Sequence, residues 1–85
     1  MPRNIAKPVS ENDAYHADKV QRAIAPIDYR DVTLTYTKRN GEASSSTGKV
    51  AFFSGVKGWD THSVTIDTAD KGPRTINLHR VIKVQ

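Results

Sequence analysis

The apolar positions near the start of the chain recur every three or four residues, and this spacing predicts a helix. Ala17, Val20 and Ile24 would form one narrow apolar stripe, which must dock on another element to be stable. Ser10 and Asp13 have the spacing of a capping box, so the helix begins after Ser10. It ends at Ala25, because the residue before Pro26 avoids helical backbone angles.

From Asp31 onward the apolar positions alternate with polar ones, which is typical of half-buried strands. The first strand contains Val32, Leu34 and Tyr36, separated by threonines. The other predicted strands are residues 49–53, a strand around Val64 and Ile66, residues 74–78 and residues 82–84. Phe52 and Phe53 are adjacent, so they cannot both face the core.

Glycines and polar residues mark the turns between these strands. Asn40-Gly41 is expected to supply the positive-φ residues of a tight hairpin, and residues 43–48 to lengthen it into a mobile tip. Gly55 and Gly58 bracket a second turn, and residues 70–72 form another hairpin.

One helix followed by five short antiparallel strands predicts a mainly β fold, a small five-stranded SH3-like or Sm-like barrel with an N-terminal helix. At 85 residues the chain is one domain. Residues 1–9 are expected to be a flexible arm and residues 10–85 a single helix-plus-barrel domain. The expected core of the barrel consists of Val32, Leu34, Tyr36, Val64, Ile66, Ile76, Leu78 and either Val81 or Ile82.

Composition limits the kinds of site and the cellular location that are expected of the chain. The absence of cysteine excludes disulfides and thiolate metal sites. No apolar run approaches the length of a membrane-spanning helix or of a signal-peptide core. These features predict a soluble, cytoplasmic protein.

The net charge of +4 lies entirely in the β half. Residues 1–31 have five cations and five anions, whereas residues 32–85 have eight cations and four anions. A basic face attracts phosphate groups through long-range electrostatics. The alternative interpretation is an ordinary charged surface that keeps a small domain soluble.

The candidate ligand-binding residues are cations, an aromatic ring and an imidazole in this half of the chain. Arg74 and Arg80 stand at the two ends of the fourth strand, about 20 Å apart if the strand is straight. That distance is too long for one phosphate but fits successive phosphates of one strand. The predicted site consists of Lys49, Lys57, Trp59, Arg74, His79 and Arg80.

Each of these residues also has a structural interpretation. Trp59 could stack on a base, or it could belong partly to the core. His79 could line a groove at the rim, or it could be structural. Arg74 and Arg80 could bind phosphate, or they could pair with Asp67 or Asp70.

Four segments of the chain resemble the WYL domain: residues 20–24, 32–36, 40–42 and 74–81. The closing Arg74-x-Ile76-x-Leu78-x-Arg80 keeps the spacing of that family, with Ile76 where the family usually has phenylalanine. The resemblance implies a regulatory module of bacterial or phage transcription that binds nucleic acid or a nucleotide-like ligand. A second resemblance is to the Rho-binding antiterminator, another small Sm-like domain.

The sequence does not favour catalysis, a metal site or a cofactor. Ser44, Ser45 and Ser46 have no histidine near them in sequence, and His16, His62 and His79 are scattered. Two functions therefore remain. The first is binding of nucleic acid or a nucleotide-like anion through the basic face. The second is docking of a protein partner on Phe52, on Phe53 or on a strand edge.

Overall fold

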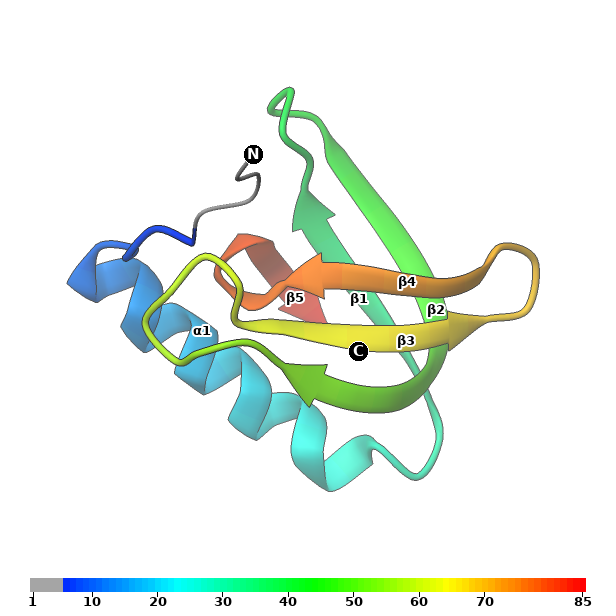
Figure 1. Ribbon diagram of the computed structural model, residues 1–85. Coiled ribbons are helices and arrows are strands. Elements are labelled where there is room, and N and C mark those ends of the chain that lie inside the picture. The colour runs from blue at the N-terminus through cyan, green and yellow to red at the C-terminus, as the bar shows by residue number, and fades with distance from the viewer. Residues whose placement is uncertain (1–5) are drawn as a thin grey trace, which may run out of the picture.

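The computed structural model describes residues 6–85, which form one N-terminal helix and a curved antiparallel sheet (Figure 1). The elements are α1 (Glu11–Ile24), the 3₁₀ turn η1 (Ala25–Ile27), β1 (Asp31–Thr37), β2 (Ala43–Ser54), β3 (Ser63–Thr68), β4 (Gly72–Asn77), the 3₁₀ turn η2 (Leu78–Arg80) and β5 (Val81–Val84).

The helix begins where its N-cap predicts and ends one residue before the predicted Ala25. The Ser10 hydroxyl accepts a hydrogen bond from the Asp13 amide at 3.1 Å, so one otherwise unpaired amide of the first turn is satisfied. The α-helix ends at Ile24, and Pro26 lies in the 3₁₀ turn that follows. The apolar stripe is buried as expected, on Ala17, Val20 and Ile24.

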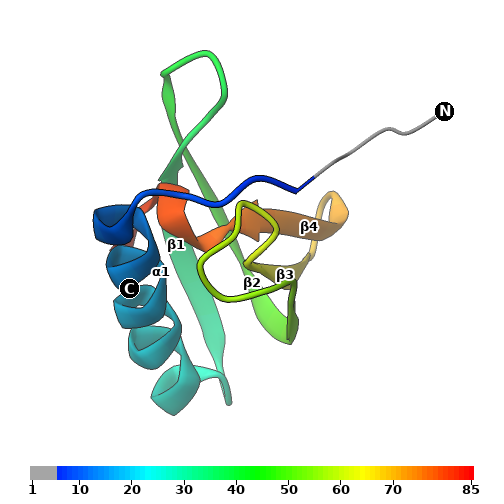
Figure 2. The same cartoon turned by 60° about the vertical axis from the view of Figure 1, so that its left-hand side comes forward.

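The five strands are all antiparallel and follow the order β4-β3-β2-β1-β5. This confirms the predicted five-stranded antiparallel sheet with one N-terminal helix. Its edge strands β4 and β5 are not hydrogen-bonded to each other, so the sheet does not close. The helix lies along one side of this open, strongly curved sheet (Figure 2).

The prediction of a mobile tip at residues 43–48 is wrong, because these residues form the first half of β2. Their hydroxyls pair across the strands. The Thr33 and Thr47 oxygens are 2.8 Å apart, and those of Thr35 and Ser45 are 3.1 Å apart. Gly48 is required for close packing, since a Cβ there would lie 2.5 Å from the Asp67 carbonyl oxygen. Small polar residues therefore indicate hydroxyl pairing and tight packing here, not mobility.

The β1–β2 hairpin differs from the predicted tight turn. Gly41 has a φ of 91°, but Asn40 does not have a positive φ. The Lys38 amide donates to the Glu42 carbonyl at 2.7 Å, and the Gly41 amide donates to the Lys38 carbonyl at 2.9 Å. These bonds close a three-residue loop with one left-handed glycine, which is the next most common hairpin after the two-residue type.

The fourth strand ends one residue earlier than predicted, at Asn77, because residues 78–80 form the turn η2. This turn packs against α1 and buries Leu78 completely. The chain that follows this turn also shows which of Val81 and Ile82 occupies the last core position. Val81 is 1% exposed and belongs to the core, whereas Ile82 is 59% exposed.

The core lies between α1 and the concave face of the sheet. The expected core is confirmed, with Tyr36 at its margin. The largest fully buried side chains are Ile24, Leu34, Ile66, Leu78, Val32, Val64 and Val81. An irregularity in the β2–β3 register between Val50 and Phe52 accompanies the adjacent phenylalanines. Phe53 packs against the core, whereas Phe52 is 55% exposed.

The predicted N-terminal arm lies partly outside the described residues, which exclude residues 1–5. Its described end is hydrogen-bonded to the loop between β2 and β3. The Val9 amide donates to the Gly58 carbonyl, and the Asp60 amide donates to the Lys7 carbonyl. Over residues 6–85, no helix has the length and apolar character needed to cross a membrane.

Candidate functional site

A basic groove lies between the end of β1, the hairpin that follows it, and the edge strand β4. Its volume is about 430 Å³. It is lined by Tyr36, Thr37, Lys38, Arg39, Pro73, Arg74, Thr75, Ile76, Asn77 and Arg80. Four of these ten residues are cations, and none is acidic.

The hairpin fixes the position of two of the cations. Lys38 is held by backbone hydrogen bonds to Gly41 and Glu42, and Arg39 is the first residue of the loop that they close. The Asn40 side chain supports the loop, because its oxygen accepts from the Glu42 amide at 3.0 Å. The Asn40 nitrogen also donates to the Glu42 carboxylate at 3.3 Å. The acid nearest to these cations in sequence is thus engaged within the loop.

The cations of the groove have no carboxylate within 4.0 Å among residues 6–85. Within residues 6–85, the ion pairs shorter than 4.0 Å both involve Asp18, on α1. The alternative in which Arg74 and Arg80 pair with Asp67 or Asp70 is therefore not the arrangement found in the structure. Four like charges around one groove repel each other, and an anion that enters it relieves this repulsion.

Arg74 and Arg80 line the same groove, but they do not stand on one straight strand as expected. The turn η2 is the reason. It interrupts the extended chain after Asn77 and places Arg80, half-buried, on the groove. Both guanidinium groups can therefore act on one short segment of a ligand.

Tyr36 adds an aromatic ring to this wall. Its phenol oxygen lies 3.2 Å from the Ser46 hydroxyl. That hydrogen bond lowers the pKa of Tyr36 below its ordinary value, and the charges of Arg74 and Lys38 lower it further. The positive charges of the groove thus favour the ionised form of the Tyr36 hydroxyl.

Lys49 lies outside the groove, in the middle of the sheet. The strand register places it beside Asp31 of β1 and Asp67 of β3. Opposite charges on neighbouring strands attract each other across a sheet. Lys49 therefore lies between two acidic residues of the neighbouring strands, although neither carboxylate is within 4.0 Å of its ammonium.

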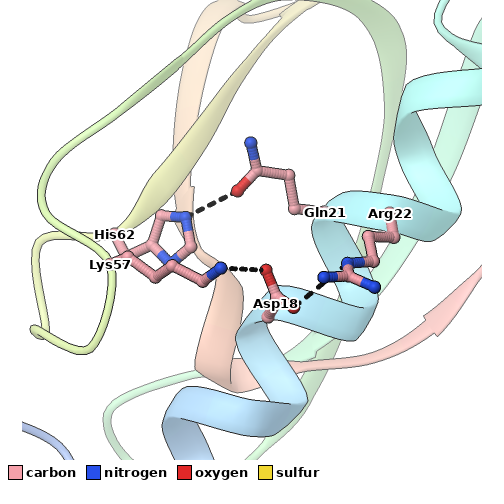
Figure 3. A network of polar contacts seen from close by, with 5 residues as sticks. All are labelled: Asp18, Gln21, Arg22, Lys57 and His62. Atoms are coloured by element: carbon pink, nitrogen blue, oxygen red, sulfur yellow. Dashed lines mark hydrogen bonds and ion pairs between the residues drawn. The ribbon is translucent and has the colours of Figure 1, made fainter.

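Lys57 belongs to a second polar cluster, between α1 and the loop after β2 (Figure 3). Its ammonium lies 2.8 Å from Asp18 Oδ1, and Arg22 Nε lies 3.1 Å from Asp18 Oδ2. The hydrogen bond from Lys57 lowers the pKa of Asp18, and both cations lower it further. The cluster borders a pocket of about 520 Å³.

His62 completes this cluster, which we call the α1–loop cluster (Asp18, Gln21, Arg22, Lys57 and His62). Its Nε2 lies 2.7 Å from Gln21 Oε1, and the residue is only 6% exposed. Burial lowers the pKa of His62 below its ordinary value, and the nearby Asp18 raises it in part. His62 is therefore neutral at pH 7 and holds the loop to the helix through Gln21.

Trp59 and His79 also lie away from the lining of the groove. Trp59 is 40% exposed, and its backbone bridges to Pro8. His79 is half-buried in η2, where burial lowers its pKa and the charge of Arg80 lowers it further. Of the six residues predicted for the site, only Arg74 and Arg80 line the basic groove.

Sequence reasoning missed Lys38, Arg39, Tyr36 and Asn77 as lining residues. The sequence contains one signal for them: Lys38 and Arg39 stand directly before the Asn40-Gly41 turn, which indicates two cations at a hairpin. Their distance in sequence from Arg74 and Arg80 concealed the connection. It is the curvature of the sheet that brings the β1 end and β4 to one groove.

Residues 6–85 contain no group of three or more histidines, aspartates or glutamates placed to hold a metal ion. Comparisons with protein-family models, with curated proteins and with solved structures found no match to this chain.

Proposed function

We propose that this chain is a non-enzymatic module that binds single-stranded nucleic acid along the basic groove. The observation that supports this most strongly is a set of four cations with no carboxylate within 4.0 Å among residues 6–85: Lys38, Arg39, Arg74 and Arg80. Such a set of cations suits the phosphate backbone of a nucleic acid. Each phosphate that a lysine or arginine neutralises releases counterions, and this release favours binding.

Single strands fit the groove better than a duplex does, for reasons of size and lining. At about 430 Å³ the groove accommodates a small segment, not the side of a double helix. Tyr36 offers an aromatic surface beside the cations, and bases of any sequence stack on such rings. We therefore expect weak, sequence-tolerant and salt-sensitive binding.

The resemblance to WYL domains supports the same proposal. We propose a divergent WYL-like module with an opened SH3-like or Sm-like arrangement of strands, acting in bacterial or phage transcription regulation in the cytoplasm. Arg74 and Arg80 belong both to the motif that resembles the family and to the groove. The hydroxyls of Ser45 and Ser46 pair with Thr35 and Tyr36 rather than with a histidine, which is why we propose no enzymatic activity.

The test is a fluorescence anisotropy titration with a labelled single-stranded oligonucleotide of about 16 nucleotides, of DNA and of RNA, over a range of salt concentrations. Four phosphate contacts predict a slope of log affinity against log salt of about −3. Replacing Arg74 or Arg80 by glutamine should weaken binding about tenfold at low salt and reduce the slope by about one unit.

The matched control is Arg30→Gln, which removes one positive charge from an exposed arginine outside the groove. It should change affinity only through the net charge of the domain. The proposal is wrong if the natural chain does not bind at high micromolar concentration. Equal effects of the Arg30 and Arg80 replacements would also contradict it.

A second candidate is a protein-interaction module, for which the exposed Phe52 is the specific observation. A large aromatic side chain that is more than half exposed on a strand is a common anchor of interfaces. Binding of this kind barely responds to salt. It would be lost on Phe52→Ala and kept on Arg80→Gln, so the two functions give opposite results with the same variants.

A further inference from the structure

The strand β4 lies at the edge of the sheet, so half of its backbone groups have no partner strand. The pairing of β4 with β3 determines which backbone groups of β4 these are. The Leu78 amide donates to the His62 carbonyl at 2.9 Å, directly after the paired residues Ser63 and Asn77. In an antiparallel ladder, hydrogen-bonded pairs alternate with pairs whose amides point away from each other. Ser63 and Asn77 therefore form a non-hydrogen-bonded pair, and the amide of each points away from the other residue.

The alternation continues along the strand in steps of two residues. The Thr65–Thr75 and Asp67–Pro73 pairs are of the same kind as Ser63–Asn77. The amides of Thr75 and Asn77 thus point away from β3, toward the outer side of β4. None of the turn and loop hydrogen bonds within residues 6–85 uses either amide. Both residues line the basic groove.

The third outward position of β4 is Pro73, which has no amide hydrogen to donate. A proline and charged side chains on an edge strand are devices that prevent another strand from pairing with it. Arg74 within β4 and Arg80 just after it add such charges. The edge is thus unsuited to a long added strand but keeps two donors inside a cationic groove.

The spacing of these donors matches one kind of anionic chain. Residues two apart in a strand are separated by about 6.6 Å, and an extended single strand of nucleic acid covers a similar distance between adjacent phosphates. Two such amides are too far apart to hold one phosphate together. They suit two phosphates in succession, with Arg74 and Arg80 supplying charge in the same groove.

We propose that the main-chain amides of Thr75 and Asn77 bind adjacent phosphates of a single strand that runs along the edge of β4. This inference rests on the proposed function, since it concerns the same groove. It adds the direction of the ligand, parallel to β4, and it adds donors that no change of side-chain charge can remove. It also explains sequence tolerance, because the contacts are made to the phosphate backbone.

Asn77→Pro is a direct test, because it removes one of these amide hydrogens. Asn77 has a φ of −69° and precedes a 3₁₀ turn, which suits the fixed φ of proline. No sheet hydrogen bond is lost, since this amide points away from β3. The matched control is Asn77→Ala, which removes the side-chain amide but keeps the main-chain hydrogen.

We expect Asn77→Pro to bind the labelled oligonucleotide about tenfold more weakly than Asn77→Ala, because a hydrogen bond to a charged group is lost. The slope of affinity against salt should be the same in both, since a neutral donor releases no counterion. Arg80→Gln should instead change the slope. Equal affinities of the proline and alanine variants would overturn the proposal.

A measurement on the unaltered chain guards against misfolding of the proline variant. In a proton–nitrogen NMR titration with the oligonucleotide, the amide protons of Thr75 and Asn77 should shift downfield, the direction expected on hydrogen bonding to phosphate. The amides of Ile76 and Arg74, which point into the sheet, should shift less. If arginine replacements weaken binding while neither edge amide responds, the proposed function stands and this inference fails.

Discussion

Two regions of this small domain contain clustered cations, and they place them in opposite surroundings. In the α1–loop cluster, Arg22 and Lys57 both contact Asp18, at 3.1 Å and 2.8 Å. In the basic groove, the cations have no carboxylate within 4.0 Å among residues 6–85. The first arrangement joins the helix to a loop. The second leaves positive charge available to a ligand.

The comparison shows why net charge is a weak guide to function. Lys57 and Arg80 each contribute one unit to the same total of +4. The charge of Lys57 is balanced by a neighbouring carboxylate, whereas Arg80 shares its groove with three other cations. Whether a cation is available to a ligand depends on whether a carboxylate lies beside it, and the fold determines that.

The largest effect is expected from Val20→Asp, on the helix that contains Asp18 and Gln21. Val20 is 6% exposed, and it faces the core from α1. A carboxylate there has no partner, so we expect a loss of about 3–5 kcal/mol in the free energy of unfolding. A domain of this size has little more than that to lose. Thermal and urea unfolding, followed by circular dichroism, would measure it.

The matched control for this variant is Ala23→Asp, at an exposed position of the same helix. It reproduces the lower helix propensity of aspartate without burying its charge, so it should cost less than about 1 kcal/mol. If the two variants melt together, α1 is not docked on the sheet, and the α1–loop cluster has no structural role.

The elements of this fold follow from local patterns that the sequence displays. The apolar stripe, the Ser10 cap and Pro26 define the helix. The alternation of Val32, Leu34 and Tyr36 defines β1. These signals depend on neighbours within a few residues. The exception is β2, whose first half has the composition of a loop and becomes a strand through hydroxyl pairs with β1.

The groove could be predicted only in part, because its residues come together through long-range geometry. Arg74 and Arg80 stand out in sequence by flanking an alternating strand. Lys38 and Arg39 join them through the curvature of the sheet, which no local pattern specifies. The pairing of Lys57 with Asp18, 39 residues away in sequence, is equally invisible to local patterns. Local patterns therefore suggest a ligand-binding role for Lys57, whereas the fold pairs it with Asp18.

Acid should weaken the fold through two histidines, the buried His62 and the half-buried His79. The pKa of His62 is lowered by burial, with Asp18 and Lys57 as its charged neighbours. The pKa of His79 is also lowered by burial, among Arg80, Asp13, Asp60 and His16. The unfolded chain thus takes up protons first as the pH falls through 6.5, the ordinary value for histidine. Stability present above that pH is then lost.

Melting temperatures measured between about pH 7 and pH 5 would show this decline. His62→Gln keeps a polar group that can face Gln21 but does not titrate, so its melting temperature should depend less on pH over this range. A natural chain whose melting temperature rises toward pH 5 would contradict the neutral state of His62 in the folded protein.

The smallest effect is expected from Lys57→Gln, and it tests the comparison most directly. Lys57 is exposed and makes its ion pair at the surface, where such pairs contribute little to stability. The hydrogen bond from Lys57 is the largest influence that lowers the pKa of Asp18. Its removal should therefore raise that pKa toward 3.8, the ordinary value, which a carbon-detected NMR titration of the Asp18 carboxyl would register.

The same variant should bind the oligonucleotide as Arg30→Gln does, since both lose one charge outside the groove. Its salt slope should match that of the natural chain, because no phosphate contact is removed. A reduced slope would mean that the nucleic acid reaches the α1–loop cluster and displaces Asp18 from Lys57. The two regions would then form one continuous path for the strand, and the distinction between paired and unpaired cations would no longer separate fold from function.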